Sequence, residues 1–268
     1  MSIDRISEMI IRVAQQEILP RFKNLSRKDV MAKSPGDMVS IADIAAEKAL
    51  SLELNKLFPM ALVAGEESIA DEPELLKAAI SAEQAFLIDP VDGTNNFIKG
   101  DDKFALMLTE LRQGEVVAGW IYLPVSDKIA VAEKAGGAFL DGKKITIHRP
   151  EFNPGAMTAA AHINRFPEDL KTTARENLKI FKQNRPAFCA GYDYISLVEG
   201  EKDFSVYYRT LPWDHLPGSL IFSEAGGYVR TLFDQKPYVV QDQDKGLLSA
   251  TDKEQWQEIR EIIFPGIY

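Results

Sequence analysis

Acidic side chains follow short apolar segments at separate places in the chain. Glu66 and Glu67 come directly after residues 61–65, and Asp89 comes directly after residues 86–88. A further acid, Asp214, lies at the start of a predicted helix. Strand ends and helix N-termini are rigid, so their side chains can be directed at one point. If these acids form one site, the fold must bring the distant segments together; taken singly, each segment could also be a surface turn or a helix cap.

Hydrophobic periodicity predicts a mixed helix and sheet protein, an α+β or α/β chain of two tightly packed lobes. A segment rich in proline and glycine at 149–156 predicts a boundary between an N-terminal lobe, 1–150, and a C-terminal lobe, 151–268. The expected helices cover 2–22, 41–58, 167–183, 191–200, 214–225 and 252–263. The expected strands cover 61–65, 86–88, 103–111, 115–123, a meander over 128–147, and 157–162, 186–190, 203–208, 228–232 and 246–250.

Composition excludes several kinds of protein. A net charge of −9 argues against direct nucleic-acid binding through phosphate neutralisation. An anionic substrate would then need a bound divalent cation. The single cysteine, Cys189, excludes an intramolecular disulfide and a cysteine-based metal site. The first residues do not resemble a signal peptide, and no apolar run approaches the ~18 residues of a membrane span. We therefore expect a cytoplasmic protein without a membrane segment.

The segment 89–94 has the chemistry of a magnesium site. Pro90 keeps Asp89 out of the right-handed helical region, and Gly93 can adopt a positive φ. The resulting turn can bring the carboxylates of Asp89 and Asp92 and the Val91 carbonyl to one side. Such hard oxygen ligands suit Mg²⁺. The amides of Gly93 and the next residue could bind a phosphate oxygen.

Three motifs together resemble the signatures of the inositol monophosphatase family. They are GEES at 65–68, IDPVDGTNNF at 88–97 and WDHLPGSLIFSEAGG at 213–227. The resemblance covers essentially the whole chain. It implies a metal-dependent, lithium-sensitive phosphatase that hydrolyses a small phosphorylated metabolite by direct attack of a metal-activated water. It also implies a layered αβαβα sandwich and a homodimer.

The resemblance implies a role for each acidic side chain. Glu66, Asp89 and the Val91 carbonyl would bind one Mg²⁺, and Asp89, Asp92 and Asp214 would bind another. About two or three Mg²⁺ ions per site are expected, with Mn²⁺ as a substitute.

The remaining implied roles concern the water and the phosphate. Glu66 and Thr94 would position the attacking water, with Asp43 supporting Thr94. The amides of Gly93 and Thr94 would hold the phosphate.

The substrate-side residues depart from the family pattern. Tyr207 stands where inositol-selective members carry a glutamate, and Arg209 follows two residues later. The segment of small residues that lines this pocket in the family appears here as Phe188-Cys189-Ala190-Gly191. Ala190 and Gly191, together with Asp92, are expected to contact the substrate. We expect a substrate with an aromatic ring or a second anion to be better than inositol 1-phosphate. Histidinol phosphate, fructose 1,6-bisphosphate and a 3′,5′-nucleotide bisphosphate remain open.

Two other classes of protein share parts of this pattern. A haloacid dehalogenase-type phosphatase needs carboxylates one residue closer together than Asp89 and Asp92. A regulatory, protein-binding member of the same fold also remains open. His148 and His162 are expected to be structural or on the surface, and Cys189 a small buried filler. The sequence leaves open the roles of His215 and of the tyrosines at 192, 194, 207 and 208.

Overall fold

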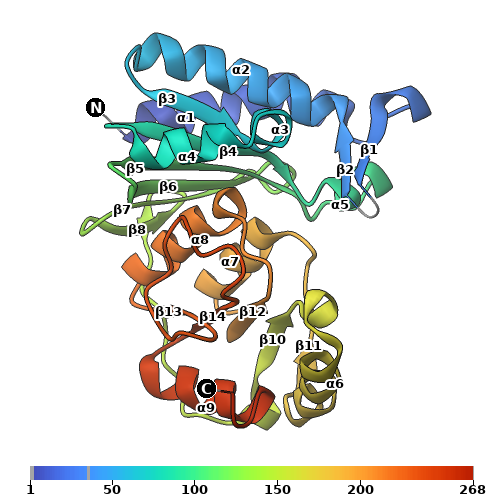
Figure 1. Cartoon of the computed structure of the whole chain (residues 1–268), viewed down its shortest axis with the longest axis vertical. Helices are drawn as coiled ribbons and strands as arrows, with labels where there is room; N and C mark the ends of the chain where they lie inside the picture. The colour runs from blue at the N-terminus through green and yellow to red at the C-terminus, as the bar shows by residue number, and fades with distance from the viewer. Residues whose placement is uncertain (1–2, 35–36, 268) are drawn as a thin grey trace.

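The computed structural model describes residues 3–34 and 37–267. Helices and sheets alternate in layers from one end of the molecule to the other (Figure 1). Helices α1 and α2 cover a mixed sheet, α7 and α8 fill the middle, and a second sheet is covered by α6 and α9. This arrangement confirms the predicted layered αβαβα fold. Three of the apolar clusters occupy the interfaces between successive layers.

Among the described residues, the larger sheet has seven strands in the order β3-β4-β5-β6-β7-β8-β9. The pair β3 and β4 is parallel, and every later pair is antiparallel. The strands are β3 Leu62–Gly65, β4 Ala85–Asp92, β5 Ala105–Arg112, β6 Glu115–Leu123, β7 Lys128–Glu133, β8 Gly137–Leu140 and β9 Lys143–Lys144. The parallel pair places the ends of β3 and β4 at the same edge, where Glu66 and Asp89 lie.

The outer face of this sheet is covered by two helices. The predicted N-terminal helix begins as α1 Ile3–Val13 and continues as a π-helical turn, Ala14–Ile18, and a 3-10 turn, Leu19–Arg21. Its apolar side packs with α2 Ile41–Leu57 against Phe86 and Ile88 of β4.

Several short elements at this end escaped the sequence prediction. They are the hairpin β1 Val30–Ser34 and β2 Asp37–Ser40, and the helices α3 Glu66–Asp71, α4 Glu74–Ser81 and α5 Thr94–Lys99. The segment Lys33-Ser34-Pro35-Gly36-Asp37 also predicts a turn, and the centre of this turn lies outside the described residues. Strand β4 also runs on to Asp92, beyond the predicted end at Asp89.

The middle layer consists of α7 Ala190–Val198 and α8 Pro212–Glu224. The two helices pack together so closely that a Cβ at Gly218 would lie 2.0 Å from Tyr194 Cδ2. A glycine at this position therefore permits the contact.

Within the described chain, the second sheet has five strands in the order β11-β10-β12-β14-β13. They are β10 Thr158–Ala161, β11 Gln183–Asn184, β12 Phe204–Tyr207, β13 Tyr228–Thr231 and β14 Leu247–Ala250. Helices α6 Glu168–Asn177 and α9 Lys253–Ile263 cover its outer face (Figure 1). Short 3-10 turns occur at Arg27–Asp29, Pro154–Ala156, Ile163–Arg165 and Leu178–Ile180.

One predicted helix of this half is too long, and one predicted strand is wrong. The helix expected over 167–183 ends as α6 at Asn177 and continues only as a 3-10 turn. The strand expected at 186–190 is irregular chain, and the edge strand is β11 instead. Phe188 in that segment has φ +57°, which a strand cannot contain.

The division into lobes at residue 150 stays a proposal. It is supported by the sheets, because β3–β9 all precede this point and β10–β14 all follow it.

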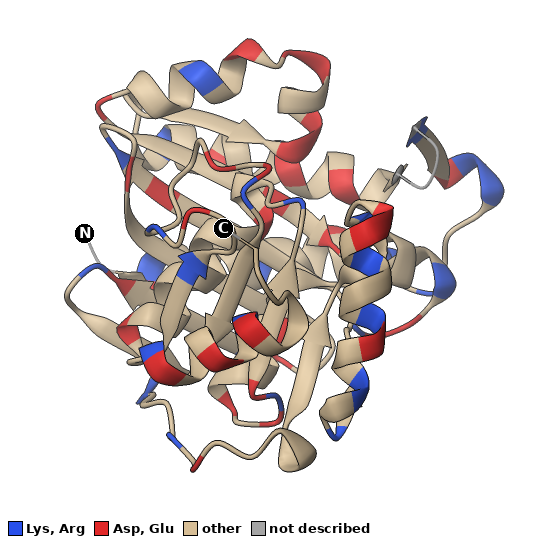
Figure 2. Cartoon of the chain, turned by 60° about the horizontal axis from the view of Figure 1, so that its bottom comes forward, with Lys and Arg blue, Asp and Glu red and all other residues tan. Residues whose placement is uncertain are grey.

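Lys and Arg are interspersed with Asp and Glu over the helices seen in Figure 2. Among the described residues, no helix is long and apolar enough to span a membrane.

Candidate active site

The end of β4 is bent so that Asp89 and Asp92 face the same region. Asp89 pairs with Met107 and Asp92 with Ala105, so β4 advances by three residues while β5 advances by two. The extra residue forms a bulge, which accommodates Pro90, a residue that cannot donate a ladder hydrogen bond. Gly93 follows with φ +85°, and a Cβ there would lie 2.9 Å from the Lys103 carbonyl oxygen. Glycine is therefore required where the chain enters α5.

Glu66 is held by the helix that follows β3. Both carboxylate oxygens of Glu47 on α2 accept hydrogen bonds from the first turn of α3, from Glu67 N at 2.8 Å and Ser68 N at 2.9 Å. Lys33 donates to Glu66 Oε1 at 2.9 Å and to Glu67 Oε1 at 2.6 Å. These contacts fix the start of α3, so Glu66 projects from a rigid base.

Asp214 reaches the same point from the first turn of α8. Among the described residues, Glu66, Asp89 and Asp214 form a potential metal site, in which one oxygen from each lies within 4.8 Å of the others. The fold thus joins three of the predicted metal ligands. The donor set contains oxygen only, which fits a hard divalent cation such as Mg²⁺.

The carboxylates in this cluster repel one another. Burial raises the pKa of Asp89 well above its usual range, and the charges of Glu66 and Asp214 raise it further. Burial, together with Asp92 and Glu66, does the same for the pKa of Asp214, while Arg209 opposes the shift. Buried carboxylates with raised pKa values are typical of functional sites. In the protein alone the charged form of these carboxylates is therefore unfavourable, and a bound cation would stabilise it.

Asp92 is tied to the N-terminus of α7. Its Oδ2 accepts hydrogen bonds from Gly191 N at 2.6 Å and Cys189 Sγ at 3.0 Å. Burial nevertheless raises the pKa of Asp92 to about 6, although the Gly191 and Cys189 hydrogen bonds lower it. Cys189 is thus more than a buried filler, since it orients a predicted metal ligand.

The hydroxyl of Thr94 lies between two acceptors, Asp43 Oδ1 at 3.1 Å and the Val91 carbonyl at 3.0 Å. Asp43 Oδ2 accepts from Ser40 N at 2.9 Å and Ser40 Oγ at 2.5 Å, in the capping box that begins α2. Burial raises the pKa of Asp43 to about 6. The contact between Asp43 and Thr94 that the resemblance implied is present, and the catalytic roles of both stay predictions.

These residues line a cavity of about 560 Å³. Its metal end is formed by Glu66, Asp89, Asp92 and Asp214, with Val91, Gly93 and Thr94 beside them. Ala190, Tyr207 and Arg209 line the other side, whereas Gly191 does not line the cavity and acts on it through Asp92. The roles of these substrate-side residues stay predictions.

Tyr207, which stands at the position of the family's glutamate, is part of the packed wall of the cavity. Its side chain is buried, and its hydroxyl donates to Asp193 Oδ2 at 3.3 Å. One ring face stacks on His162, with centroids 4.5 Å apart, and His215 packs against the ring at 4.4 Å. Its hydroxyl is therefore already engaged within the protein.

His215 is buried beside Asp214, and its Nδ1 lies 3.4 Å from the hydroxyl of Tyr194. Burial lowers the pKa of His215 to about 3. The ring is therefore neutral, and it packs among tyrosines rather than offering a positive charge to phosphate.

Two further residues belong to the cavity wall, and the sequence predicts one of them, His162, to be structural or on the surface. His162 and Phe188 line the same cavity. His162 is bound to Asp193, which follows it by 31 residues, so no local pattern could show the contact. The unusual acid within Tyr192-Asp193-Tyr194 was the available signal.

A layered αβαβα sandwich around an acidic, oxygen-lined cavity defines a class of metal-dependent phosphatases. The model of the inositol monophosphatase family matches residues 2–263. This chain belongs to the inositol monophosphatase family.

Individual relatives agree with the family match. The chain is 30% identical over 235 residues to a fructose-1,6-bisphosphatase/inositol-1-monophosphatase of Aquifex aeolicus, covering 85% of this chain and 84% of the relative. It is 29% identical over 235 residues to an inositol-1-monophosphatase of Rhizobium meliloti, covering 82% and 84%. The crystal structure of the extragenic suppressor protein suhB from Bartonella henselae superposes with a TM-score of 0.81 at 25% identity, covering 96% of this chain and 95% of that one. The protein is thus a phosphatase, a phosphoric monoester hydrolase.

Proposed function

We propose that this protein is a Mg²⁺-dependent phosphomonoesterase that hydrolyses a small phosphorylated metabolite. The observation that carries the proposal is the convergence of Glu66, Asp89 and Asp214 within 4.8 Å at one end of the cavity. The three side chains come from different elements. Bringing their carboxylates together in a partly buried place is electrostatically unfavourable without a cation, which is typical of a functional site. An oxygen-only set of this kind fits Mg²⁺ or Mn²⁺ better than a softer metal.

Two ions would be held by overlapping sets of ligands. Glu66, Asp89 and the Val91 carbonyl would hold one, and Asp89, Asp92 and Asp214 the other. When bound, the ions would lower the pKa of a water, neutralise the phosphate and stabilise the leaving alkoxide. Asp92 is held in place for this by Gly191 N and Cys189 Sγ.

Thr94 and Glu66 would orient the attacking water. Asp43 fixes the Thr94 hydroxyl, so that a lone pair on Thr94 Oγ1 can accept a hydrogen bond from the water. The amides of Gly93 and Thr94 would bind the phosphate at the start of α5. This amide pair is supported by the left-handed φ of Gly93, which turns the backbone at that point.

The leaving group would lie toward Ala190, Tyr207 and Arg209. The Arg209 guanidinium is close enough to the metal end to affect the pKa of Asp214, and it would favour a substrate with a second anion. We expect inositol 1-phosphate to be a weaker substrate than histidinol phosphate, fructose 1,6-bisphosphate or a 3′,5′-nucleotide bisphosphate.

Further properties are proposed from family membership alone. We propose a homodimer, a cytoplasmic location, and inhibition by Li⁺ in the presence of Mg²⁺. Li⁺ that leaves activity unchanged at concentrations inhibiting an inositol monophosphatase assayed in parallel would remove that part of the proposal.

The test is phosphate release by metal-stripped protein from a panel of these esters and inositol 1-phosphate. We expect no release in EDTA and recovery on addition of Mg²⁺ or Mn²⁺. Full release in EDTA would contradict the metal-dependent mechanism. No release from any ester with either ion would instead favour a protein-binding role.

A further inference from the structure

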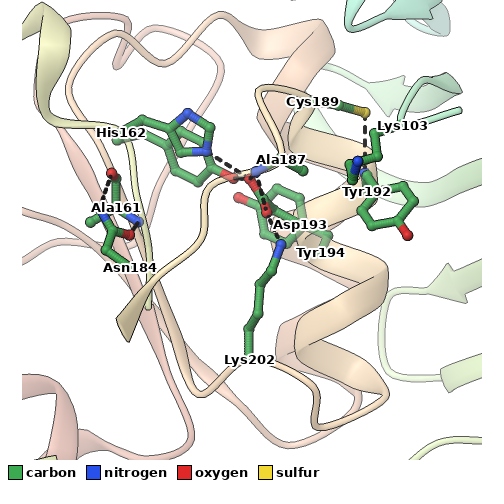
Figure 3. Close-up of polar contacts among 12 residues, drawn as sticks. Lys103, Ala161, His162, Asn184, Ala187, Cys189, Tyr192, Asp193, Tyr194 and Lys202 are labelled. Atoms are coloured by element: carbon green, nitrogen blue, oxygen red, sulfur yellow. Dashed lines mark hydrogen bonds and ion pairs between the residues drawn. The ribbon is translucent and has the colours of Figure 1, made fainter. Parts of the chain in front are cut away.

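Asp193 is a fully buried carboxylate whose hydrogen-bond partners are all donors (Figure 3). The buried ammonium group of Lys202 binds Oδ1, and His162 Nε2 lies 2.6 Å from Oδ2. The Ala187 amide donates to Oδ1 at 3.1 Å, and the Tyr207 hydroxyl donates to Oδ2 at 3.3 Å. Lys202 balances the negative charge, so the network is complete without a ligand.

This network fixes the tautomer of His162. An ionised carboxylate only accepts hydrogen bonds, so the proton of the imidazole must be on Nε2. In the neutral ring, Nδ1 then carries a lone pair and can accept a hydrogen bond. Figure 3 shows Nε2 directed to Asp193 and the second ring nitrogen on the other side. No described residue forms a hydrogen bond with Nδ1.

The ring of His162 is also held in orientation. Tyr207 stacks on it at 4.5 Å with an interplanar angle of 18°, and Phe188 meets it edge to face at 5.6 Å and 85°. The side chain of His162 keeps 18% of its surface exposed, in the wall of the cavity.

Phe188 is presented to the same cavity at a conformational cost. Its φ of +57° is unfavourable for a bulky residue, and yet 59% of its surface is exposed. Strained conformations of this kind persist mainly where the surrounding structure or function requires them. An exposed aromatic ring beside an oriented imidazole is a surface for a flat, partly apolar group.

We propose that Phe188 and His162 bind a planar ring on the leaving group of the phosphomonoester. Phe188 stacks on the ring, and His162 Nδ1 accepts a hydrogen bond from an N–H or O–H that it carries. Asp193 and Lys202 act as positioning residues for His162. The inference rests on the proposed function, because it names the class of alcohol that the phosphatase releases.

The test compares adenosine 5′-monophosphate with ribose 5-phosphate, which differ only in the planar base. The measured quantity is the ratio of kcat/KM for the two esters with Mg²⁺ present. We expect a ratio above about 10 for the unaltered protein, because stacking on one aromatic side chain gives effects of this order. Phe188→Gly and His162→Phe should each lower the ratio by about tenfold, mainly through KM for the nucleotide.

The controls separate recognition from structure. Glycine is the residue best suited to a positive φ, so Phe188→Gly should melt no lower than the unaltered protein while the ratio falls. Phe139→Ala, which removes another exposed ring on β8, and His148→Phe, on the surface before β10, should leave the ratio unchanged.

Two results overturn the inference in distinguishable ways. Hydrolysis of both esters with a ratio near one, or a ratio that Phe188→Gly and His162→Phe do not change, removes the planar-ring subsite and leaves the phosphatase function standing. No phosphate release from either of these esters or from the wider panel, with Mg²⁺ or Mn²⁺, removes both.

Discussion

The cavity has two ends that treat buried carboxylates in opposite ways. At the metal end, burial and neighbouring acids raise the pKa values of Asp89 and Asp214. Under the substrate-side wall, burial alone would raise the pKa of Asp193, but the hydrogen bonds from His162 and Lys202 and the charge of Lys202 hold it below its usual range. Asp89 and Asp193 are both buried, so the difference comes from their partners.

That difference shows which site is complete. Asp193 has donors for both oxygens and a buried counter-charge, so the protein itself satisfies it. At the metal end, the ion pairs among the described residues join only Lys33 to the acids, and Lys33 is shared between Glu66 and Glu67. The metal end is therefore the unsatisfied end, whose acids require a bound cation. The substrate-side wall around Asp193 is the satisfied end, because its hydrogen bonds and charges are complete without a ligand.

The largest expected effect is at the unsatisfied end. Asp214→Asn should lower kcat/KM by at least about 100-fold, or ~3 kcal/mol on the barrier, because it removes a charged ligand of the two proposed metal ions. Steady-state assays with saturating Mg²⁺ measure it. Asp169→Asn, an exposed acid on α6, is the matched control. Near-normal turnover of Asp214→Asn would show that Asp214 does not serve the reaction.

Disrupting the ion pair between Asp193 and Lys202 at the satisfied end should lower the stability of the protein. Asp193→Asn leaves the buried Lys202 ammonium without its carboxylate, which should lower the free energy of unfolding by ~3 kcal/mol. Urea denaturation measures the change. The double variant Asp193→Asn/Lys202→Met removes the unpaired charge, so it should recover part of the loss. If the single and double variants are equally stable, the ion pair is not what satisfies Asp193.

The stability of the protein should also depend on pH through the acids at and beside the metal end. The pKa values of Asp43 and Asp92 are raised to about 6, so the folded protein binds more protons than the unfolded chain between about pH 4 and pH 6. His215, whose pKa is lowered to about 3, opposes this effect, and Glu67, whose pKa is raised to about 7, adds to it. Together these groups should let metal-stripped protein gain stability, by ~1 kcal/mol or more, as the pH falls from about 7.5 to about 5.5. Denaturant titrations in EDTA measure this, and a loss of stability over that range would contradict the raised pKa values.

The convergence of Glu66, Asp89 and Asp214 could be predicted from the sequence because these acids lie in compact motifs. Residues 88–97 predicted the turn that brings Asp89 and Asp92 to one side, although not the bulge at Pro90 that extends β4 to Asp92. The substrate-side wall could not be predicted in the same way. Its contacts join His162 to Asp193 and Cys189 to Asp92 across 31 and 97 residues. Partners so far apart meet only through the packing of α7 between the sheets.

The contrast between the ends is tested most directly by thermal melting with and without Mg²⁺. In EDTA, Asp214→Asn should melt higher than the unaltered protein, because one of several mutually repelling acids is neutralised. With saturating Mg²⁺ the order should reverse, because the unaltered protein binds the ions more tightly and gains more stability from them. Asp193→Asn should melt lower in both conditions. An Asp214→Asn variant that melts below the unaltered protein in EDTA, or an order unchanged by Mg²⁺, would contradict the account.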